Sequence, residues 1–210
     1  MMTLSERWRN LWQALRAPEI PEKTLADLIT AYSSPGRFYH NLKHVEDCLR
    51  IFDLCKDFAA HPEAVELAIW FHDAVYDSRS GDNEQKSADW ARLVIKRAGL
   101  DEALAEKVWR LILATRHNEE AVDEDARVLV DVDLSILGRE GEVFWEYEHN
   151  IRREYAWVPD FLFKRKRAEI LRNFLEREHI YQLELCRRKF ESTARQNIGE
   201  ALAKLEGATI

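Results

Sequence analysis

Apolar side chains recur every three or four residues along almost the entire chain, whereas the strict alternation of a half-buried strand is hard to find. This spacing places the apolar residues on one face of a helix. Only seven Gly and five Pro are spread over 210 residues, too few for the many turns of a sandwich or barrel. Since the chain also contains no repeat and no linker, we expect one compact all-α domain.

Capping residues, glycines and prolines predict where these helices begin and end. The expected helices cover residues 4–15, 25–32, 41–52, 83–98, 101–112 and 124–137, and three more follow, with breaks at 157–159 and 179–181. The segment AVELAIWFHDAVY, just after Pro62, is expected to form a strongly apolar helix. The segment VLVDVDLSIL is rich in Val and Ile, as a buried strand would be, but the acidic residues before it and Gly138 after it favour a helix.

Charge and cysteine content restrict the partners and the compartment of the chain. A formal net charge of −7 does not favour binding to duplex nucleic acid, although a local basic patch can still bind a small anion. Cys48, Cys55 and Cys186 are scattered, form no CxxC pair and are interpreted as reduced core residues. The first residues lack the pattern of a signal peptide, and no apolar stretch is long enough to span a membrane. We therefore expect a cytoplasmic protein without a membrane partner.

The most informative polar residues are His72 and Asp73, which are adjacent near the end of the apolar helix. Burying either side chain without a partner is costly, so both need an ion or hydrogen bonds. Adjacent helix positions point about 100° apart, so the two side chains can bracket an ion in a groove between helices. In the alternative interpretation, His72 interacts with the dipole at the helix C-terminus and Asp73 caps the following loop.

An ordered set of residues makes this pair more specific. His44 lies 28 residues before His72, and Asp133 lies 60 residues after Asp73, each within an expected helix. Two imidazoles and two carboxylates, with no thiolate, suit octahedral Mn, Fe, Co, Ni or Mg better than a closed structural zinc site. The sequence therefore predicts a divalent-metal centre.

The motifs around these residues extend over most of the chain, from about residue 25 to 200: YHNLKHVEDCL, AIWFHDAVYD, DNEQKSA, ATRHN, DVDLSILG and IRREYAW. They resemble the HD-domain metal-dependent phosphohydrolase superfamily, and more narrowly a bacterial branch of predicted HD phosphohydrolases. The resemblance implies an HD-type helical bundle with additional C-terminal helices. It places a single domain over 1–210, with a metal-binding core at about 25–180 and a helix at 183–207 packed on it.

The resemblance also implies which residues hold the metal. The ligand roles fall to one ordered set, which binds one divalent ion per chain: His44, His72, Asp73 and Asp133. Two neighbouring residues stay open as alternatives, His40 in place of His44 and Asp131 in place of Asp133.

Groups for water activation and proton transfer are expected close to this centre. Asp73 can bind the metal and orient the attacking water, and His117 can protonate a leaving oxygen, bind phosphate or hold a second metal. Glu84 and Asp77 are further candidates for a general acid or base. Each has a structural alternative: Glu84 suits a helix N-terminus, Asp77 can cap a loop, and His117 can be a solvated loop residue.

Cationic side chains can bind the phosphate of a substrate. The candidates, in addition to His117, are His40, Lys43, Lys86 and Arg152. The charge run at 164–167, by contrast, is expected to be a solvated helix face with ion pairs between residues four apart.

The leading functional hypothesis is an enzyme, a phosphohydrolase that cleaves a small phosphorylated metabolite or nucleotide through a metal-activated water. Two alternatives stay open. One is a di-iron HD-type oxygenase, for which His117 would supply an additional ligand. The other is a non-catalytic, metal-stabilised interaction module. An apolar stripe on the terminal helix, 190–205, can mediate a homodimer, and core packing explains the stripe equally well.

Overall fold

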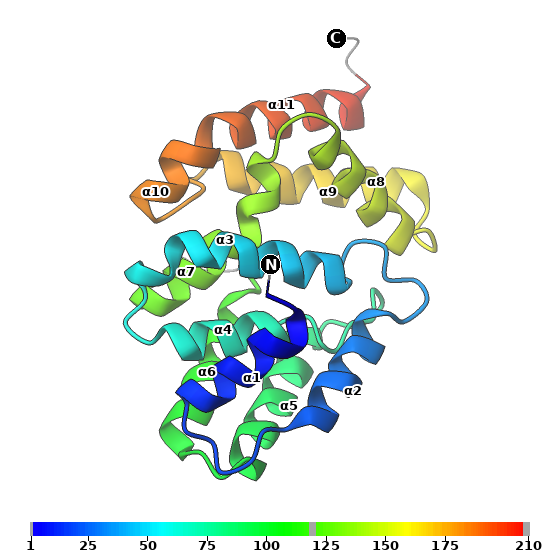
Figure 1. The fold of residues 1–210 in the computed structure, drawn as a ribbon. Coiled ribbons are helices and arrows are strands. Elements are labelled where there is room, and N and C mark those ends of the chain that lie inside the picture. The colour runs from blue at the N-terminus through cyan, green and yellow to red at the C-terminus, as the bar shows by residue number, and fades with distance from the viewer. Residues whose placement is uncertain (1, 118–120, 208–210) are drawn as a thin grey trace. The chain divides into compact units, whose positions relative to one another are not determined.

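The computed structural model describes residues 2–117 and 121–207, and within these ranges the chain is all-helical without a β-strand (Figure 1). The all-α prediction is therefore confirmed. The Val- and Ile-rich segment is helical as well: α7 spans Glu124–Asp133 and the 3₁₀ helix η2 follows at Leu134–Gly138. None of the described helices is long and apolar enough to cross a membrane.

The chain divides into two compact units, residues 1–132 and 133–210. The boundary falls inside α7, so that Asp133, the last residue of this helix, opens the second unit. The expectation of a single domain stays a prediction, because the compactness of the two parts does not decide whether they fold independently.

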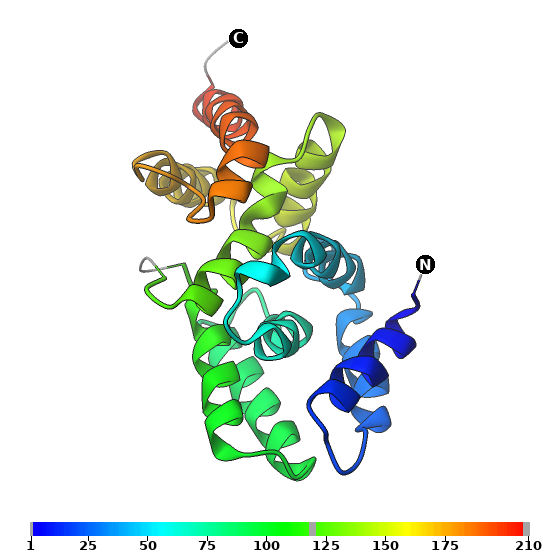
Figure 2. The same ribbon diagram turned by 60° about the vertical axis from the view of Figure 1, so that its left-hand side comes forward.

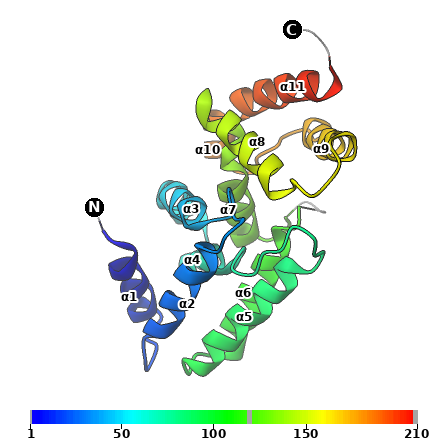
Figure 3. The same ribbon diagram turned by 90° about the vertical axis from the view of Figure 1, so that its right-hand side faces the viewer.

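Helix α4 lies at the centre of the first unit. This unit contains α1 (Leu4–Ala14), α2 (Glu22–Tyr32), α3 (Leu42–Cys55), the 3₁₀ helix η1 (Lys56–Phe58), α4 (Pro62–Phe71), α5 (Asn83–Arg97), α6 (Glu102–Ala114) and most of α7. Helix α4 contacts α1, α3, α5 and α6, with α1 and α2 on one side of it and α5 and α6 on the other (Figure 3). Because it is surrounded, every side chain from Ala64 to Phe71 except Glu66 is buried, as expected for a helix that is apolar on all faces.

Packed aromatic rings and the ion pairs of one arginine hold α1 against α4. The ring of Trp8 lies 5.3 Å from that of Trp70 on α4, measured between centroids. Arg7, the residue before it, forms ion pairs with Glu66 of α4 at 2.9 Å and with Asp53 of α3 at 2.8 Å. Its side chain is 11% exposed, so Arg7 is a largely buried link between three helices.

The second unit is built around η2. Its other elements are α8 (Glu142–Glu154), α9 (Asp160–Leu175), α10 (Glu184–Cys186), the π-helix η3 (Arg187–Glu191) and α11 (Ser192–Glu206). Helices α8, η3 and α11 contact η2, and α11 packs beside α9 (Figure 2). Gly138 permits the close approach of η3, because a Cβ there would lie 2.5 Å from the Cβ of Phe190. Asn197 of α11 donates hydrogen bonds of 2.8 Å to the carbonyl oxygens of Leu137 and Arg139.

One residue of the predicted solvated charge run is buried. The guanidinium of Arg167 on α9 forms an ion pair with the carboxylate of Glu148 on α8 and donates to the Tyr147 hydroxyl at 2.7 Å. Lys164 and Lys166 are exposed, as expected, and pair with acidic residues of their own helix. The prediction is therefore wrong for Arg167 alone, because this position of α9 faces α8 and a carboxylate there compensates the buried charge.

Candidate metal centre

The N-terminus of α3 positions His44. The side chain of Asn41 caps this helix, and its Oδ1 accepts hydrogen bonds from the backbone N–H groups of Lys43 at 3.0 Å and His44 at 3.3 Å. Its Nδ2 donates to the carbonyl oxygen of Phe38 at 2.9 Å. Asn41 is the N-cap expected from the sequence. It fixes the first turn of α3, from which the His44 side chain is directed into the protein, where the residue is 5% exposed.

The end of α4 positions the His-Asp pair. The helix ends at Phe71, earlier than the sequence pattern predicts, with His72 as its C-cap and Asp73 in the turn that follows. The expectation that both residues lie within the helix is therefore wrong. The chain leaves the helix because backbone groups beyond it are bonded elsewhere: the N–H of Val75 donates to the hydroxyl of Ser87 on α5 at 3.0 Å.

A single hydrogen bond determines how His72 presents its ring. Its Nδ1 lies 2.9 Å from the carbonyl oxygen of Ile69, and since a carbonyl only accepts, Nδ1 carries the proton. In the neutral imidazole Nε2 therefore has a lone pair, and this atom lies 3.0 Å from Nε2 of His44 and 3.1 Å from Oδ2 of Asp73. A lone pair that faces a carboxylate oxygen is repelled unless a proton or a metal cation lies between them.

Three donor atoms thus converge on one point. The third distance, from Nε2 of His44 to Oδ2 of Asp73, is 3.6 Å. Ligand atoms 90° apart around an octahedral ion with bonds of about 2.1 Å lie about 3.0 Å from one another. The three measured separations are close to this value, and the chemical types, two imidazoles and one carboxylate, suit a divalent transition metal.

The carboxyl group of Asp73 is deprotonated, which is the form that binds a cation. Burial raises its pKa, but the neighbouring rings of His72, His40 and His44, when they are protonated, more than offset this effect, so that the pKa lies well below the usual range. Its side chain is 15% exposed, whereas those of His72 and His44 are 2% and 4% exposed. The carboxylate is therefore the member of the trio most accessible to solvent.

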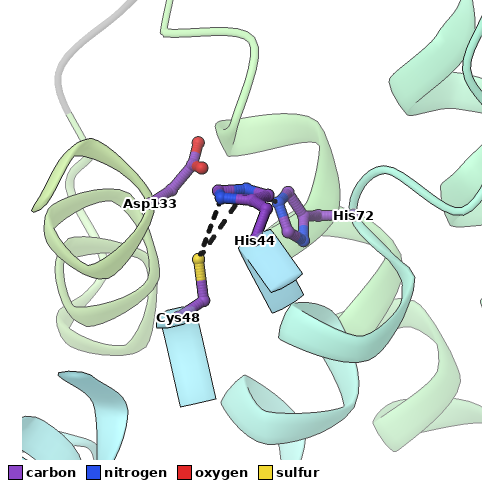
Figure 4. Close-up of side chains that lie close together, drawn as sticks. All are labelled: His44, Cys48, His72 and Asp133. Carbon is purple, nitrogen blue, oxygen red and sulfur yellow. Dashed lines mark hydrogen bonds between the residues drawn. The ribbon is translucent and has the colours of Figure 1, made fainter. Parts of the chain in front are cut away.

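A further donor lies near the histidines (Figure 4). The thiol sulfur of Cys48, one turn after His44 on α3, lies within 4.8 Å of the ligand atoms of His44 and His72. These three buried residues belong to a group that can hold a metal ion. Asp133 is the last residue of α7 and the first residue of the second unit, and its ligand role stays a prediction. Cys48 was not expected from the sequence, although its spacing of four residues from His44 on one helix is a signal that could have identified it.

The two alternative ligands lie outside this group. His40 stacks its ring on that of Tyr76, with the centroids 4.2 Å apart, and its centroid lies 6.2 Å from that of His44. Asp131 is completely buried on α7, two residues before Asp133. His44, which the family resemblance favours over His40, belongs to this group, and the choice of Asp133 over Asp131 stays a prediction.

Arg37 links the two segments that carry the ligands. Its guanidinium donates to the carbonyl oxygens of His40 at 3.1 Å, Asp73 at 2.6 Å and Ala74 at 2.8 Å. It also lies over the ring of Tyr32, 5.2 Å from the centroid. Arg37 therefore ties the loop before α3 to the turn after α4. No sequence spacing indicates this role, because all three acceptors are backbone atoms.

Residues on the loop after the His-Asp pair make mainly local contacts. Asp77 accepts a hydrogen bond from the N–H of Arg79 at 2.9 Å, which is the capping role considered as its alternative. Glu84, on the first turn of α5, faces Arg116 at 3.8 Å. Lys86 pairs with Asp82, four residues earlier, at 2.8 Å and is exposed. Catalytic roles for Asp77 and Glu84, and substrate binding by Lys86, stay predictions.

The remaining predicted residues lie in different settings. Lys43 is exposed on the first turn of α3. His117 follows α6 with a φ of +56°, in the left-handed region that non-glycine residues seldom occupy, and Asn118 of the same motif lies outside the described residues. Arg152, in the second unit, donates to the carbonyl oxygens of Tyr155 at 2.6 Å and Val158 at 3.1 Å. These contacts hold the end of α8, and a phosphate-binding role for Arg152 stays a prediction.

Comparison with known proteins adds no assignment to this geometry. No family model matches the chain, and no match was found among curated proteins or solved structures.

Proposed function

We propose that the protein is a divalent-metal-dependent phosphohydrolase of the HD type, acting on a small phosphorylated metabolite or nucleotide. The observation that carries this proposal is the convergence of His44 Nε2, His72 Nε2 and Asp73 Oδ2 at separations of 3.0–3.6 Å. Support also comes from the order of these ligands along the chain, which is the order of the family that the sequence resembles.

The chain's own residues would hold the ion and prepare the water. A bound divalent ion polarises a phosphoryl oxygen and lowers the pKa of a coordinated water towards neutrality. The Ile69 carbonyl keeps the proton of His72 on Nδ1, so Nε2 stays available as a ligand. Asp73, as a carboxylate and the most exposed ligand of the trio, would accept a hydrogen bond from the attacking water and orient it.

Substrate recognition would fall to residues beside α3. His40 is half-buried and Lys43 is exposed, and both flank Asn41 at the helix N-terminus. A phosphate group close to these side chains would gain charge-assisted hydrogen bonds that compensate its negative charge. In this proposal the two cations orient the phosphate, and the reacting oxygen lies next to Asp73.

The test starts from protein stripped of metal. Mn, Co, Ni, Mg and Fe would be restored separately and phosphate release measured from nucleotides and phosphate esters. Wild type should release phosphate with at least one ion, and Asp73→Asn should not. Asp53→Asn, a carboxylate of α3 that pairs with Arg7, serves as the matched control and should keep activity. Wild type that binds metal but releases no phosphate in any combination would refute the proposal.

Metal content distinguishes the alternatives. One ion per chain fits the trio described above. Two irons per chain, together with oxygen consumption in the iron-loaded sample, would instead favour the oxygenase. A metal that raises the unfolding temperature without any turnover or oxygen consumption would favour the non-catalytic module.

A further inference from the structure

A second set of donors shares the two histidines of the metal centre. His44 and Cys48 are separated by four residues on α3, so their side chains lie on the same helix face. Pairs of ligands with this spacing are a known way for a helix to bind zinc. Both residues are buried, Cys48 being 3% exposed, and its Sγ lies 3.7 Å from each ring nitrogen of His44.

The distances allow the sulfur to reach an ion held by the histidines. The ligand atoms of His44, Cys48 and His72 lie within 4.8 Å of one another. Zinc bonds are about 2.3 Å to sulfur and about 2.1 Å to nitrogen, so a sulfur and a nitrogen bound to one tetrahedral zinc lie about 3.6 Å apart. The 3.7 Å between Cys48 Sγ and the ring nitrogens of His44 is close to this value.

We propose that this centre has two alternative coordination modes, chosen by the kind of metal. A hard ion such as Mn or Mg is held by His44, His72 and the Asp73 carboxylate, whereas a thiophilic ion such as Zn, Co or Cd also recruits the thiolate of Cys48. As the sulfur–metal bond forms, the thiol proton is released to solvent. The inference rests on the metal centre of the proposed function, but it does not depend on phosphate hydrolysis.

The functional consequence concerns the fourth coordination position. A thiolate bound there fills a position that a catalytic water would otherwise occupy, and closed sites of this type are structural and not catalytic. Thiophilic ions should therefore bind more tightly than Mn and support less turnover. Cys48 acts in this account as a ligand that selects among metals.

Cobalt spectroscopy tests the inference directly. Metal-free wild type would be titrated with Co(II), and the near-ultraviolet absorption of thiolate-to-cobalt charge transfer would be recorded. The matched variants are Cys48→Ser and Cys55→Ser, because Cys55 is equally buried on the same helix but is not part of the donor group. Wild type and Cys55→Ser should develop the band at one cobalt per chain, and Cys48→Ser should lack it.

Metal affinities give a second readout. Cys48→Ser should lower the affinity for Zn at least about tenfold, the scale of effect seen when groups around a metal are removed, and should leave the affinity for Mn nearly unchanged. The inference is overturned if cobalt-loaded wild type shows no charge-transfer band, if Cys48→Ser retains it, or if Zn and Mn affinities fall together. A cobalt band combined with no phosphate release under Mn would refute the proposed function and leave this inference standing.

Discussion

Two acidic side chains in the first unit, one completely buried and one half-buried, face different groups. Asp125, at the start of α7, is completely buried, and its Oδ2 lies 2.6 Å from Nζ of Lys107. It also accepts from the backbone N–H of His61 at 2.8 Å. Asp73 faces instead the Nε2 atoms of His72 and His44, and the Nε2 of His72 has a lone pair whenever the ring is neutral.

The difference separates a structural carboxylate from one suited to bind a ligand. A lysine ammonium is a permanent cation at neutral pH, so the Asp125 cluster is complete without an outside partner. Neutral imidazoles supply no charge, so the carboxylate of Asp73 keeps its affinity for a cation. Asp125 and Asp73 thus differ in the groups that face them, and on this basis we expect only Asp73 to bind a cation.

The largest expected effect comes from removing the charge of Asp73. Asp73→Asn should lower the affinity for Mn by at least about a hundredfold, since loss of even supporting groups costs about ten- to a hundredfold. At a pH at which the histidine rings are neutral, the metal-free variant should be no less stable than wild type, because the repulsion between the carboxylate and the lone pair of His72 disappears. Isothermal titration with Mn and thermal unfolding without metal measure the two effects. A metal-free Asp73→Asn protein that is clearly destabilised would show that this carboxylate is structural.

Asp125→Asn should lower the stability of the protein without changing its affinity for metal, the reverse of the result expected for Asp73→Asn. Removing one partner of a buried ion pair leaves the other uncompensated, and because Lys107 is 25% exposed we expect a loss of about 2 kcal/mol of unfolding free energy. The affinity for Mn should not change. Urea denaturation and Mn titration of the same preparation test both statements, and a parallel loss of metal affinity would contradict the separation of the two sites.

Substitution of Arg37 should have a smaller effect on metal affinity, because this residue only positions the segments that carry the ligands. Its planar guanidinium donates to three carbonyl oxygens, an arrangement that a lysine ammonium does not reproduce. Arg37→Lys should therefore lower the affinity for Mn about tenfold. Arg7→Ala is the control, because Arg7 is a buried arginine that ties α1 to α3 and α4 away from the trio. It should reduce stability and leave metal affinity intact; equal losses of affinity would mean that Arg37 acts only through general stability.

The smallest effect is a pH dependence of stability at the Asp125 cluster. Burial raises the pKa of Asp125, but the hydrogen bonds from Lys107 and His61 outweigh it, so the pKa is lowered in the folded protein. A carboxyl group with a lowered folded pKa contributes fully above its unfolded pKa of about 3.9 and loses this contribution as the pH falls through the folded pKa.

The stability difference between wild type and Asp125→Asn should therefore shrink as the pH falls below about 4. Urea denaturation of the metal-free proteins at acid pH measures it, and using the difference cancels the titration of groups that do not contact Asp125. A difference that persists or grows in acid would mean that Lys107 and His61 do not stabilise the charged form.

The sequence was sufficient to predict the helices and three donor residues that lie close together. The acidic residues before the Val- and Ile-rich segment and Gly138 after it correctly predicted a helix there, and the spacing of His44, His72 and Asp73 identified three donors that the structure brings together. Local chemistry also predicted Asn41 as the cap of α3. Each of these features depends on residues that are neighbours in sequence or on a pattern repeated along one helix.

Features that depend on contacts between distant segments were not predictable. Helix α4 ends at Phe71 because backbone groups beyond it, such as the N–H of Val75, are bonded elsewhere, and Arg167 is buried because α8 offers a carboxylate. Arg37 donates to carbonyl oxygens 36 and 37 residues away. Because every residue has a backbone carbonyl, the sequence does not indicate which ones accept these bonds. Cys48 appeared as a core residue because its relation to His72 requires the packing of α3 against α4.

The central claim is that His44, His72 and Asp73 hold a divalent ion. Anomalous diffraction at the Mn absorption edge, from crystals of the Mn-loaded protein, tests it most directly. The account predicts one strong peak per chain, about 2.1–2.3 Å from Nε2 of His44, Nε2 of His72 and a carboxylate oxygen of Asp73. The absence of a peak at these three atoms, or a peak elsewhere in the protein, would contradict it.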